Sequence, residues 1–315
     1  MCWGSGWYPA PFLFMKIYAA AVYTNNLELK GQTFARLTDR EKKARTDVRY
    51  ILESYHYVNK PTYVERMRRD GVRVFLDSGA FSAMQLGAEI DLDRYIRYIK
   101  ENKDIIEVAS VLDGIGDPQK TYDNQTYMER NGVRPMPCFH YGEDEQWLEY
   151  YIERYDYISL GGMVPISKPQ LLSWLDRVWD LYLTDEAGRP RIKVHGFGLT
   201  KLDLMFRYPW YSVDSTAWLM AGNNGIIIMP QDARKFPVSV DSPSRRNRGQ
   251  HFDTITEPEQ WIVYNTVTDR GFDFTRVQNT YLARWMFNLC ALDEINTRLQ
   301  AVADKGFTNP QPGLF

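Results

Sequence analysis

Three aspartates stand directly after apolar stretches that are typical of buried strands: Asp77, Asp113 and Asp214. Carboxylates contributed by different strands suit chemistry at an acetal-like carbon, where one attacks the oxocarbenium-like centre and another moves a proton. This pattern favours a sugar-like substrate. The alternative is that each aspartate only accepts backbone N–H groups at the start of the next helix or turn. Residue types and spacing leave both interpretations open.

Histidines and glycines end other predicted strands, at His140, Gly161-Gly162, His195 and Gly196. A glycine pair after a strand lets a flat ring approach the backbone, so that main-chain groups can read the edge of the ring, although a tight turn explains it equally well. His140 either contacts such a ring or caps a loop, and His195 is interpreted as structural. Neither a Walker nor a dinucleotide-binding spacing of glycines is present.

Apolar runs and helical periods alternate along the chain. Strands are predicted at 16–23, within 49–58, and at 72–76, 105–112, 134–139, 155–160, 192–195 and 210–213, with helices at 34–45, 62–70, 91–102, 118–130, 143–154, 168–183 and 200–208. This order predicts a (β/α)8 TIM barrel, in which the carboxyl ends of the strands converge on one mouth. A short strand at 226–229 and helices at 257–303 follow. We therefore expect a single domain over 1–315, with a barrel at about 16–230 and a C-terminal helical extension at about 231–315.

Composition and charge limit the partners and the compartment that the sequence predicts. The formal charge of −2 gives no global attraction to nucleic acid, so any such contact must come from a local patch. Three scattered cysteines fit a reducing compartment and no disulfide framework. The N-terminus lacks the features of a signal peptide, and no stretch is long and apolar enough to span a membrane. These features predict a soluble, cytoplasmic protein without a membrane partner.

Four motifs on successive predicted strands resemble those of the tRNA-guanine transglycosylases. They are Asp77-Ser-Gly-Ala-Phe81, Ser159-Leu-Gly-Gly-Met-Val164, His195-Gly-Phe-Gly198, and Val213-Asp-Ser215 followed by Gly222-Asn-Asn-Gly225. The resemblance runs from about residue 72 to residue 229. It implies a barrel enzyme that exchanges a guanine base in nucleic acid.

The chain departs from that family at several positions. The family carries a zinc site of three cysteines and a histidine beyond its nucleophile, whereas only Cys290 and His251 occur in that region here. We therefore expect no zinc there and no cofactor. Met220 and Asn223 replace arginines of the family, and His140 replaces a base-reading glutamine. This pattern is similar to the phage-type DNA deazaguanine transglycosylases, and for a phage-encoded enzyme the expected location is the host cytoplasm.

The resemblance implies a role for each matching residue. Asp214 is the nucleophile at the sugar anomeric carbon, Asp77 is the general acid and base, and Asp113 accepts hydrogen bonds from the N1–H and amino group of a guanine-like ring. The implied base pocket is completed by Ser78, His140, Gly161, Gly162, Met163 and Gly196.

The implied partners are DNA and a free 7-deazaguanine base such as preQ0, with the target base leaving the stack. Arg245, Arg246 and Arg248 are predicted to contact phosphates, although a solvated loop explains them as well. Three other functions stay open: a transglycosylase that acts on tRNA, a non-catalytic protein that binds deazaguanine nucleic acid, and an unrelated barrel glycosidase. The last class mostly uses glutamate at strand ends, and none of the motif-bearing ends here carries one. The sequence does not define the oligomeric state.

Overall fold

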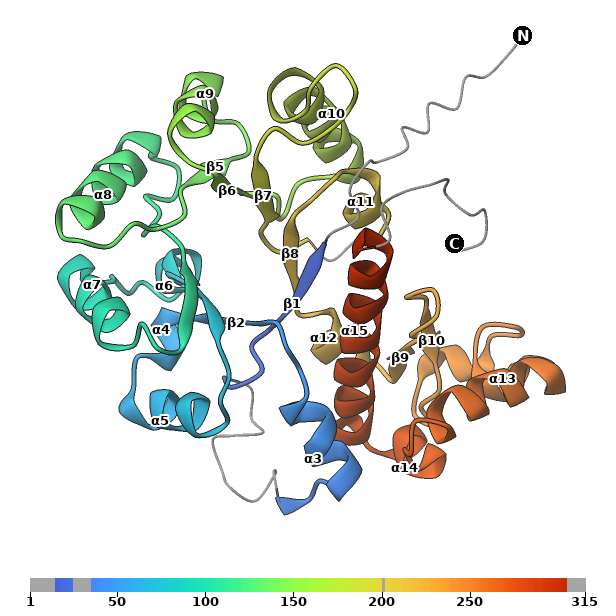
Figure 1. The fold of residues 1–315 in the computed structure, drawn as a ribbon. Helices are drawn as coiled ribbons and strands as arrows, with labels where there is room; N and C mark the ends of the chain where they lie inside the picture. The colour runs from blue at the N-terminus through green and yellow to red at the C-terminus, as the bar shows by residue number, and fades with distance from the viewer. Residues whose placement is uncertain (1–14, 25–34, 200–201, 305–315) are drawn as a thin grey trace, which may run out of the picture.

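A computed structural model describes residues 15–24, 35–199 and 202–304. The N-terminal segment, the first residues of the predicted helices at 34–45 and 200–208, and the Pro-rich tail lie outside this range. Figure 1 shows the strands gathered at the centre of the molecule, with helices around their outer side and α15 running beside α12. No helix of the described part is long and apolar enough to cross a bilayer.

Eight parallel strands form one sheet in the order β4-β3-β2-β1-β8-β7-β6-β5. The strands are β1 Lys16–Ala20, β2 Ile51–Ser54, β3 Val74–Asp77, β4 Ile106–Ala109, β5 Cys138–His140, β6 Tyr157–Gly161, β7 Lys193–Gly196 and β8 Ser212–Ser215. All eight predicted strands are therefore confirmed: β1 to β6 are shorter than predicted, and β7 and β8 have the predicted length but begin one and two residues later. Because β1 pairs with both β2 and β8, the first and last strands are neighbours and the sheet curls.

The helices between the strands follow the predicted order. They are α3 Asp39–Thr46, α4 Tyr55–Val58, α5 Pro61–Arg69, α6 Ala80–Gln85, α7 Leu92–Glu101, α8 Pro118–Arg130, α9 Glu145–Arg154, α10 Lys168–Val178 with a π-helical turn at Trp179–Leu183, α11 Leu202–Arg207 and α12 Ala217–Asn223. Four begin after an aspartate or threonine side chain that accepts a backbone N–H of the first turn: α3, α7, α8 and α9. The short helices α4 and α6 were not predicted, since neither spans two turns of apolar period.

The expectation of a closed TIM barrel is wrong in one respect. Between β4 and β5 only an isolated bridge joins Ser110 to Met136, so the strands form a half-barrel with a seam. Met136 donates its N–H to Ala109 O at 2.8 Å and accepts from Val111 N at 2.9 Å. The carbonyl of Pro137 faces the other neighbour, β6, and accepts from Ser159 N at 2.9 Å. Within the described chain, β4 and β5 are therefore joined by this single bridge.

Two apolar clusters hold the sheet. The larger lies between strands and helices, and the smaller is built on Tyr18, Ala20, Leu52, Phe75 and Met136. Because alternate residues of a strand face opposite sides, Ile17 and Ala19 join the outer cluster while Tyr18 and Ala20 join the inner one. The concave side of the sheet is thus packed with side chains.

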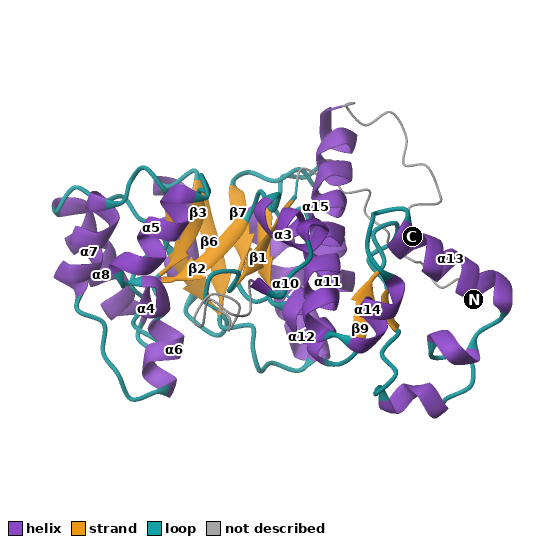
Figure 2. Ribbon diagram, turned by 90° about the horizontal axis from the view of Figure 1, so that it is seen from below, coloured by secondary structure: helices purple, strands orange, loops and turns teal. Residues whose placement is uncertain are grey.

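The C-terminal extension is confirmed as mainly helical. It consists of the antiparallel pair β9 Ile226–Ile228 and β10 Lys235–Pro237, two short 3-10 turns, η2 Pro243–Arg246 and η3 Phe252–Thr254, and the helices α13 Glu257–Thr268, α14 Phe274–Asn279 and α15 Tyr281–Asp304. Helix α15 packs against α12, α3, β9 and β1, which attaches the extension to the sheet. Figure 2 shows α13 and α14 beyond α15, on the side away from the strands. Strand β10 was not predicted, because its three residues follow no apolar run.

Glu53 is a fully buried carboxyl on β2. Its Oε1 accepts from Tyr23 N at 2.6 Å, and Thr24 Oγ1 lies 3.2 Å from Oε2. Burial raises the pKa of Glu53 to about 8, against the opposing effect of these donors. The native protein therefore keeps this group protonated at pH values where the unfolded chain has lost the proton.

We predict that Glu53→Gln, an isostere of the protonated acid, stabilises the protein more at pH 8.5 than at pH 4.5. The unfolded chain releases the Glu53 proton near the ordinary pKa of 4.5 and the native protein near 8, so wild-type stability falls across that window. Urea unfolding midpoints at both pH values measure the effect. The exposed Glu65→Gln serves as the matched control. An equal shift for Glu53→Gln at both pH values would contradict the prediction.

Candidate functional site

Three carboxylates meet at the carboxyl edge of the sheet. Asp77 ends β3, Asp113 follows β4, and Asp214 lies in β8. The three side chains lie close enough for the charges of Asp113 and Asp214 to act on Asp77. Asp113 and Asp214 have side chains only 10% exposed.

The pKa of Asp77 is raised to about 7, mainly by burial and then by the like charges of Asp113 and Asp214. Hydrogen bonds from the backbone of Ser78 and Gly79 act in the opposite direction and do not compensate. A carboxyl with a pKa near neutrality can both give and take a proton at physiological pH, which is the requirement for a general acid and base.

A tight turn fixes Asp77. Its Oδ2 accepts from Gly79 N at 3.0 Å, so the turn interpretation of this aspartate holds alongside any chemical role. Gly79 has φ 79°, and a Cβ there would lie 2.3 Å from Ser54 Oγ, so only glycine fits. Ser78 is fully buried and donates its N–H to Ser110 Oγ at 2.9 Å, which ties the turn to the end of β4.

Asp214 is not a helix cap, since the N-cap of α12 is Thr216. Its Oδ1 accepts from Gly198 N at 2.8 Å and lies 3.3 Å from His195 Nε2. His195 is fully buried, and its Nδ1 lies 2.6 Å from Ser212 Oγ. Sequence reasoning predicted His195 as structural and did not connect it with Asp214. The two-residue spacing of Ser212 and Asp214, which puts both on one face of a strand, is the signal that could have shown it.

A second group of polar side chains surrounds Asp113. His140 Nε2 lies 3.6 Å from Asp113 Oδ2 and 3.5 Å from Cys138 Sγ. Glu143 holds His140 twice, accepting from its backbone N–H at 3.0 Å and lying 3.0 Å from its Nδ1. Asp113 Oδ1 is buried and has no hydrogen-bond partner among the described residues. Glu143 was not predicted, although its position in the turn after His140 could have indicated it.

Burial by itself would lower the pKa of His140, but the neighbouring carboxylates of Asp113 and Glu143 raise it above its ordinary value. Burial and the charge of Asp113 raise the pKa of Cys138 to about 11. The group is therefore arranged as a neutral thiol and an imidazolium between two carboxylates. That arrangement leaves Asp113 Oδ1 as an acceptor for a ligand.

A metal ion could be held by one group of side chains in the described part of the chain: Asp113, Cys138 and His140. A tetrahedral zinc site separates its sulfur and nitrogen ligands by about 3.6 Å and its nitrogen and oxygen ligands by about 3.3 Å, close to the separations found here. Cys290 and His251 have other partners: Cys290 Sγ lies 3.0 Å from Arg40 Nη2, and His251 Nε2 lies 2.9 Å from Ser239 O.

Two predicted glycines make room for rings of the protein itself. A Cβ on Gly161 would lie 2.8 Å from His140 Cδ2 and 2.9 Å from Cys138 Sγ, and one on Gly196 would lie 3.0 Å from the ring of Trp210. Gly162 has φ 68° and is exposed, and Met163 beside it is buried. The absence of a side chain at Gly161 therefore sets the position of His140.

The predicted phosphate-binding arginines lie apart from the strands, on and after η2. Arg245, Arg246 and Arg248 are all exposed. Arg245 is engaged by Asp253 at 2.6 Å and by Val240 O at 3.2 Å. Within residues 35–199 and 202–304, neither Arg246 nor Arg248 has a hydrogen bond or an ion pair. The structure thus leaves two of the three guanidinium groups open to a ligand.

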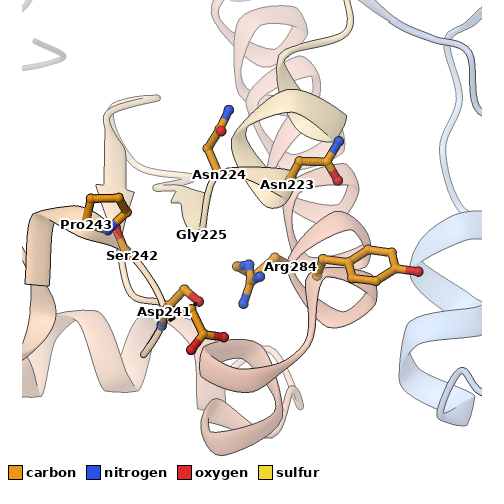
Figure 3. A pocket seen from close by; sticks show the side chains of 9 residues that line it. Asn223, Asn224, Gly225, Asp241, Ser242, Pro243 and Arg284 are labelled. Atoms are coloured by element: carbon orange, nitrogen blue, oxygen red, sulfur yellow. Dashed lines mark hydrogen bonds between the residues drawn. The ribbon is translucent and has the colours of Figure 1, made fainter.

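A polar pocket opens between the end of α12, the loop after β10 and the start of α15 (Figure 3). None of the predicted site residues lines it. Its charged groups are Asp241 and the largely buried Arg284, whose guanidinium donates to the carbonyl oxygens of Gly222 at 2.8 Å and Val277 at 2.8 Å. Because those carbonyls end α12 and α14, Arg284 serves as a shared helix cap.

Neither a protein-family model nor a curated protein matches this chain. The resemblance to the transglycosylases therefore depends on the four strand-end motifs and on the site that their residues form.

We predict that Gly161→Ala destabilises the protein by about 1–3 kcal/mol, because the added methyl group displaces His140 and Cys138. Gly142→Ala is the control: it introduces a side chain at φ 85° with nothing within 4 Å, and should cost only about 1 kcal/mol. Urea unfolding measures both variants. A smaller loss at Gly161 than at Gly142 would show that the space beside His140 is not needed.

Proposed function

We propose that the protein exchanges guanine in DNA for a 7-deazaguanine base such as preQ0. The observation that carries the proposal is the placement of Asp77, Asp113 and Asp214 at the carboxyl edge of one parallel sheet, where burial and the two like charges raise the pKa of Asp77 to about 7. Asp77 is thus a proton carrier close to the carboxylate of Asp214. The backbone N–H of Gly198 already binds one oxygen of that carboxylate. The eight parallel strands follow the order of a TIM barrel, with β1 beside β8, and the sheet is open only between β4 and β5. This order supports a relationship to that fold.

The reaction has two displacement steps. In the first, Asp214 Oδ2 attacks the anomeric carbon, the bond from carbon to the guanine nitrogen breaks, and the departing base takes its electron pair and the Asp77 proton. In the second, Asp77 removes a proton from the ring nitrogen of the incoming base. That nitrogen then attacks the anomeric carbon, and the Asp214 ester bond breaks. Both carboxyl groups return to their starting state.

The remaining residues fit recognition of the base. The unpartnered Oδ1 of Asp113 can accept from the N1–H and amino group of a guanine-like ring, a donor pair that adenine lacks. Ser78, His140, Gly162 and Met163 lie at or beside the same strand ends and would complete the proposed pocket, whereas Gly161 and Gly196 would act only through the side chains of His140, Cys138 and Trp210 that fill the space beside them. Arg246 and Arg248, with Arg245, would contact phosphates of the strand that carries the flipped base.

DNA is favoured over tRNA by the absence of the family's zinc ligands and of its arginines at Met220 and Asn223. A tRNA-directed exchange is the second candidate and a non-catalytic base-binding protein the third. The raised pKa of Asp77 argues against the third candidate, because a binding protein has no use for a proton carrier beside a second carboxylate.

We predict that the wild-type protein incorporates preQ0 into duplex DNA and that Asp214→Asn reduces the rate by at least about 1,000-fold, since an amide cannot form the ester. Asp77→Asn should reduce it by about 100- to 10,000-fold. DNA and tRNA are incubated in parallel with preQ0, digested and analysed by mass spectrometry. Asp144→Asn, which preserves the N-cap of α9, is the matched control. Normal exchange by Asp214→Asn would remove this residue as the nucleophile.

We also predict that single-turnover release of guanine slows as the pH rises through about 7. Only protonated Asp77 can protonate the leaving base, and its pKa is about 7. In Asp113→Asn one like charge is lost, so the pKa of Asp77 falls and the midpoint of the profile moves to lower pH. Rapid-quench measurement of released guanine gives both profiles. A midpoint that stays in place in Asp113→Asn would show that Asp77 is not the titrating group.

A further inference from the structure

A chain of buried side chains leads from β6 to Asp214. The Tyr157 hydroxyl lies 2.6 Å from Ser212 Oγ, and Ser212 Oγ lies 2.6 Å from His195 Nδ1. His195 Nε2 in turn faces Asp214 Oδ1 at 3.3 Å. Tyr157 is half-buried, whereas Ser212 and His195 are both fully buried and are register partners on β8 and β7. Water therefore does not compete for the contact between Ser212 and His195.

The chain has one favourable direction. If Tyr157 donates to Ser212 and Ser212 donates to His195 Nδ1, then the imidazole proton is on Nε2 and points toward Asp214. In the opposite direction, an unprotonated Nε2 would face a carboxylate oxygen, and two lone pairs would meet in a buried site. Burial lowers the pKa of His195 despite the nearby Asp214, so the ring is neutral and its tautomer decides which atom donates.

The consequence for Asp214 is geometric. Its Oδ1 accepts the Gly198 N–H at 2.8 Å and lies 3.3 Å from His195 Nε2, a buried ring nitrogen that has no hydrogen-bond partner of good geometry among the described residues. Within the described chain, Oδ2 makes no hydrogen bond or ion pair. One oxygen thus faces the protein while the other remains free. Because the His195 ring is neutral, an Nε2–H beside Oδ1 favours this orientation of the carboxylate without cancelling its charge.

We propose that His195 is a positioning residue, held in its Nε2–H tautomer by Ser212 and Tyr157, that turns Asp214 so that Oδ2 is the attacking oxygen. This inference rests on the proposed function for the identity of the reaction. The contacts that set the tautomer exist independently of it. The reactivity of Asp214 therefore depends on a hydroxyl group two strands away, at Tyr157.

Two amide substitutions separate positioning from packing. The amide nitrogen of His195→Gln reaches the place of Nε2, whereas that of His195→Asn reaches only the place of Nδ1. We expect His195→Gln to keep the exchange rate within about tenfold of the wild type. We expect His195→Asn to lose about 100-fold in kcat, the effect of a small misplacement of a reacting group, with the KM for preQ0 unchanged. Thermal unfolding checks that both variants fold.

Nitrogen NMR of the 15N-histidine-labelled full chain tests the tautomer without any activity. The chain has four histidines, and His195→Gln assigns the signal. We expect a neutral Nε2–H imidazole at pH 7.5, and a mixture of tautomers in Ser212→Ala. An Nδ1–H or imidazolium form in the wild type overturns the proposal, as does His195→Asn exchanging at the wild-type rate. The Nε2–H form in a protein that exchanges no base supports the positioning and overturns only the proposed reaction.

Discussion

The burial of Asp77 beside two like charges, at the carboxyl edge of a parallel sheet, is the constraint on which this site depends. Parallel strands all finish on the same edge, and curling the sheet brings those ends toward one another. Asp77 consequently lies within the fields of Asp113 and Asp214, in surroundings that screen poorly. The site relieves this repulsion by keeping Asp77 partly protonated near neutral pH. The same unfavourable environment that reduces stability gives Asp77 the proton affinity that acid–base chemistry requires.

The other two carboxylates, Asp214 and Asp113, have different neighbours. Asp214 is held by a backbone N–H and faces a neutral imidazole, both of which suit an ionised oxygen. Asp113 instead lies beside His140, whose own charge is supported by Glu143. Three carboxyl groups of one residue type thus acquire three environments. Different environments are what allow neighbouring carboxyl groups to take different chemical roles.

The seam in the sheet lies beside this site. A single bridge joins β4 to β5 in the described chain, and Asp113 and His140 follow those two strands. Side chains form hydrogen bonds to the backbone where β4 and β5 do not pair. Asn124 donates to Leu112 O at 2.7 Å, and Glu143 accepts from the backbone N–H of His140 at the end of β5. The packed inner cluster around Tyr18 and Phe75 supports the strands from within. The positions of Asp113 and His140 therefore depend on side-chain contacts more than on backbone pairing.

The sequence by itself determined the eight strands, their order with the helices, and the placement of Asp77, Asp113 and Asp214 at strand ends. These features depend on local apolar runs and turn residues, which act over a few neighbours. Only the tertiary structure decided that the sheet keeps a seam, that Gly161 clears space for His140, and that His195 faces Asp214. Each of these depends on contacts between strands distant in the chain, and on burial that turns weak interactions into strong ones. A histidine read as structural from its position along the chain can therefore be a partner of the proposed nucleophile.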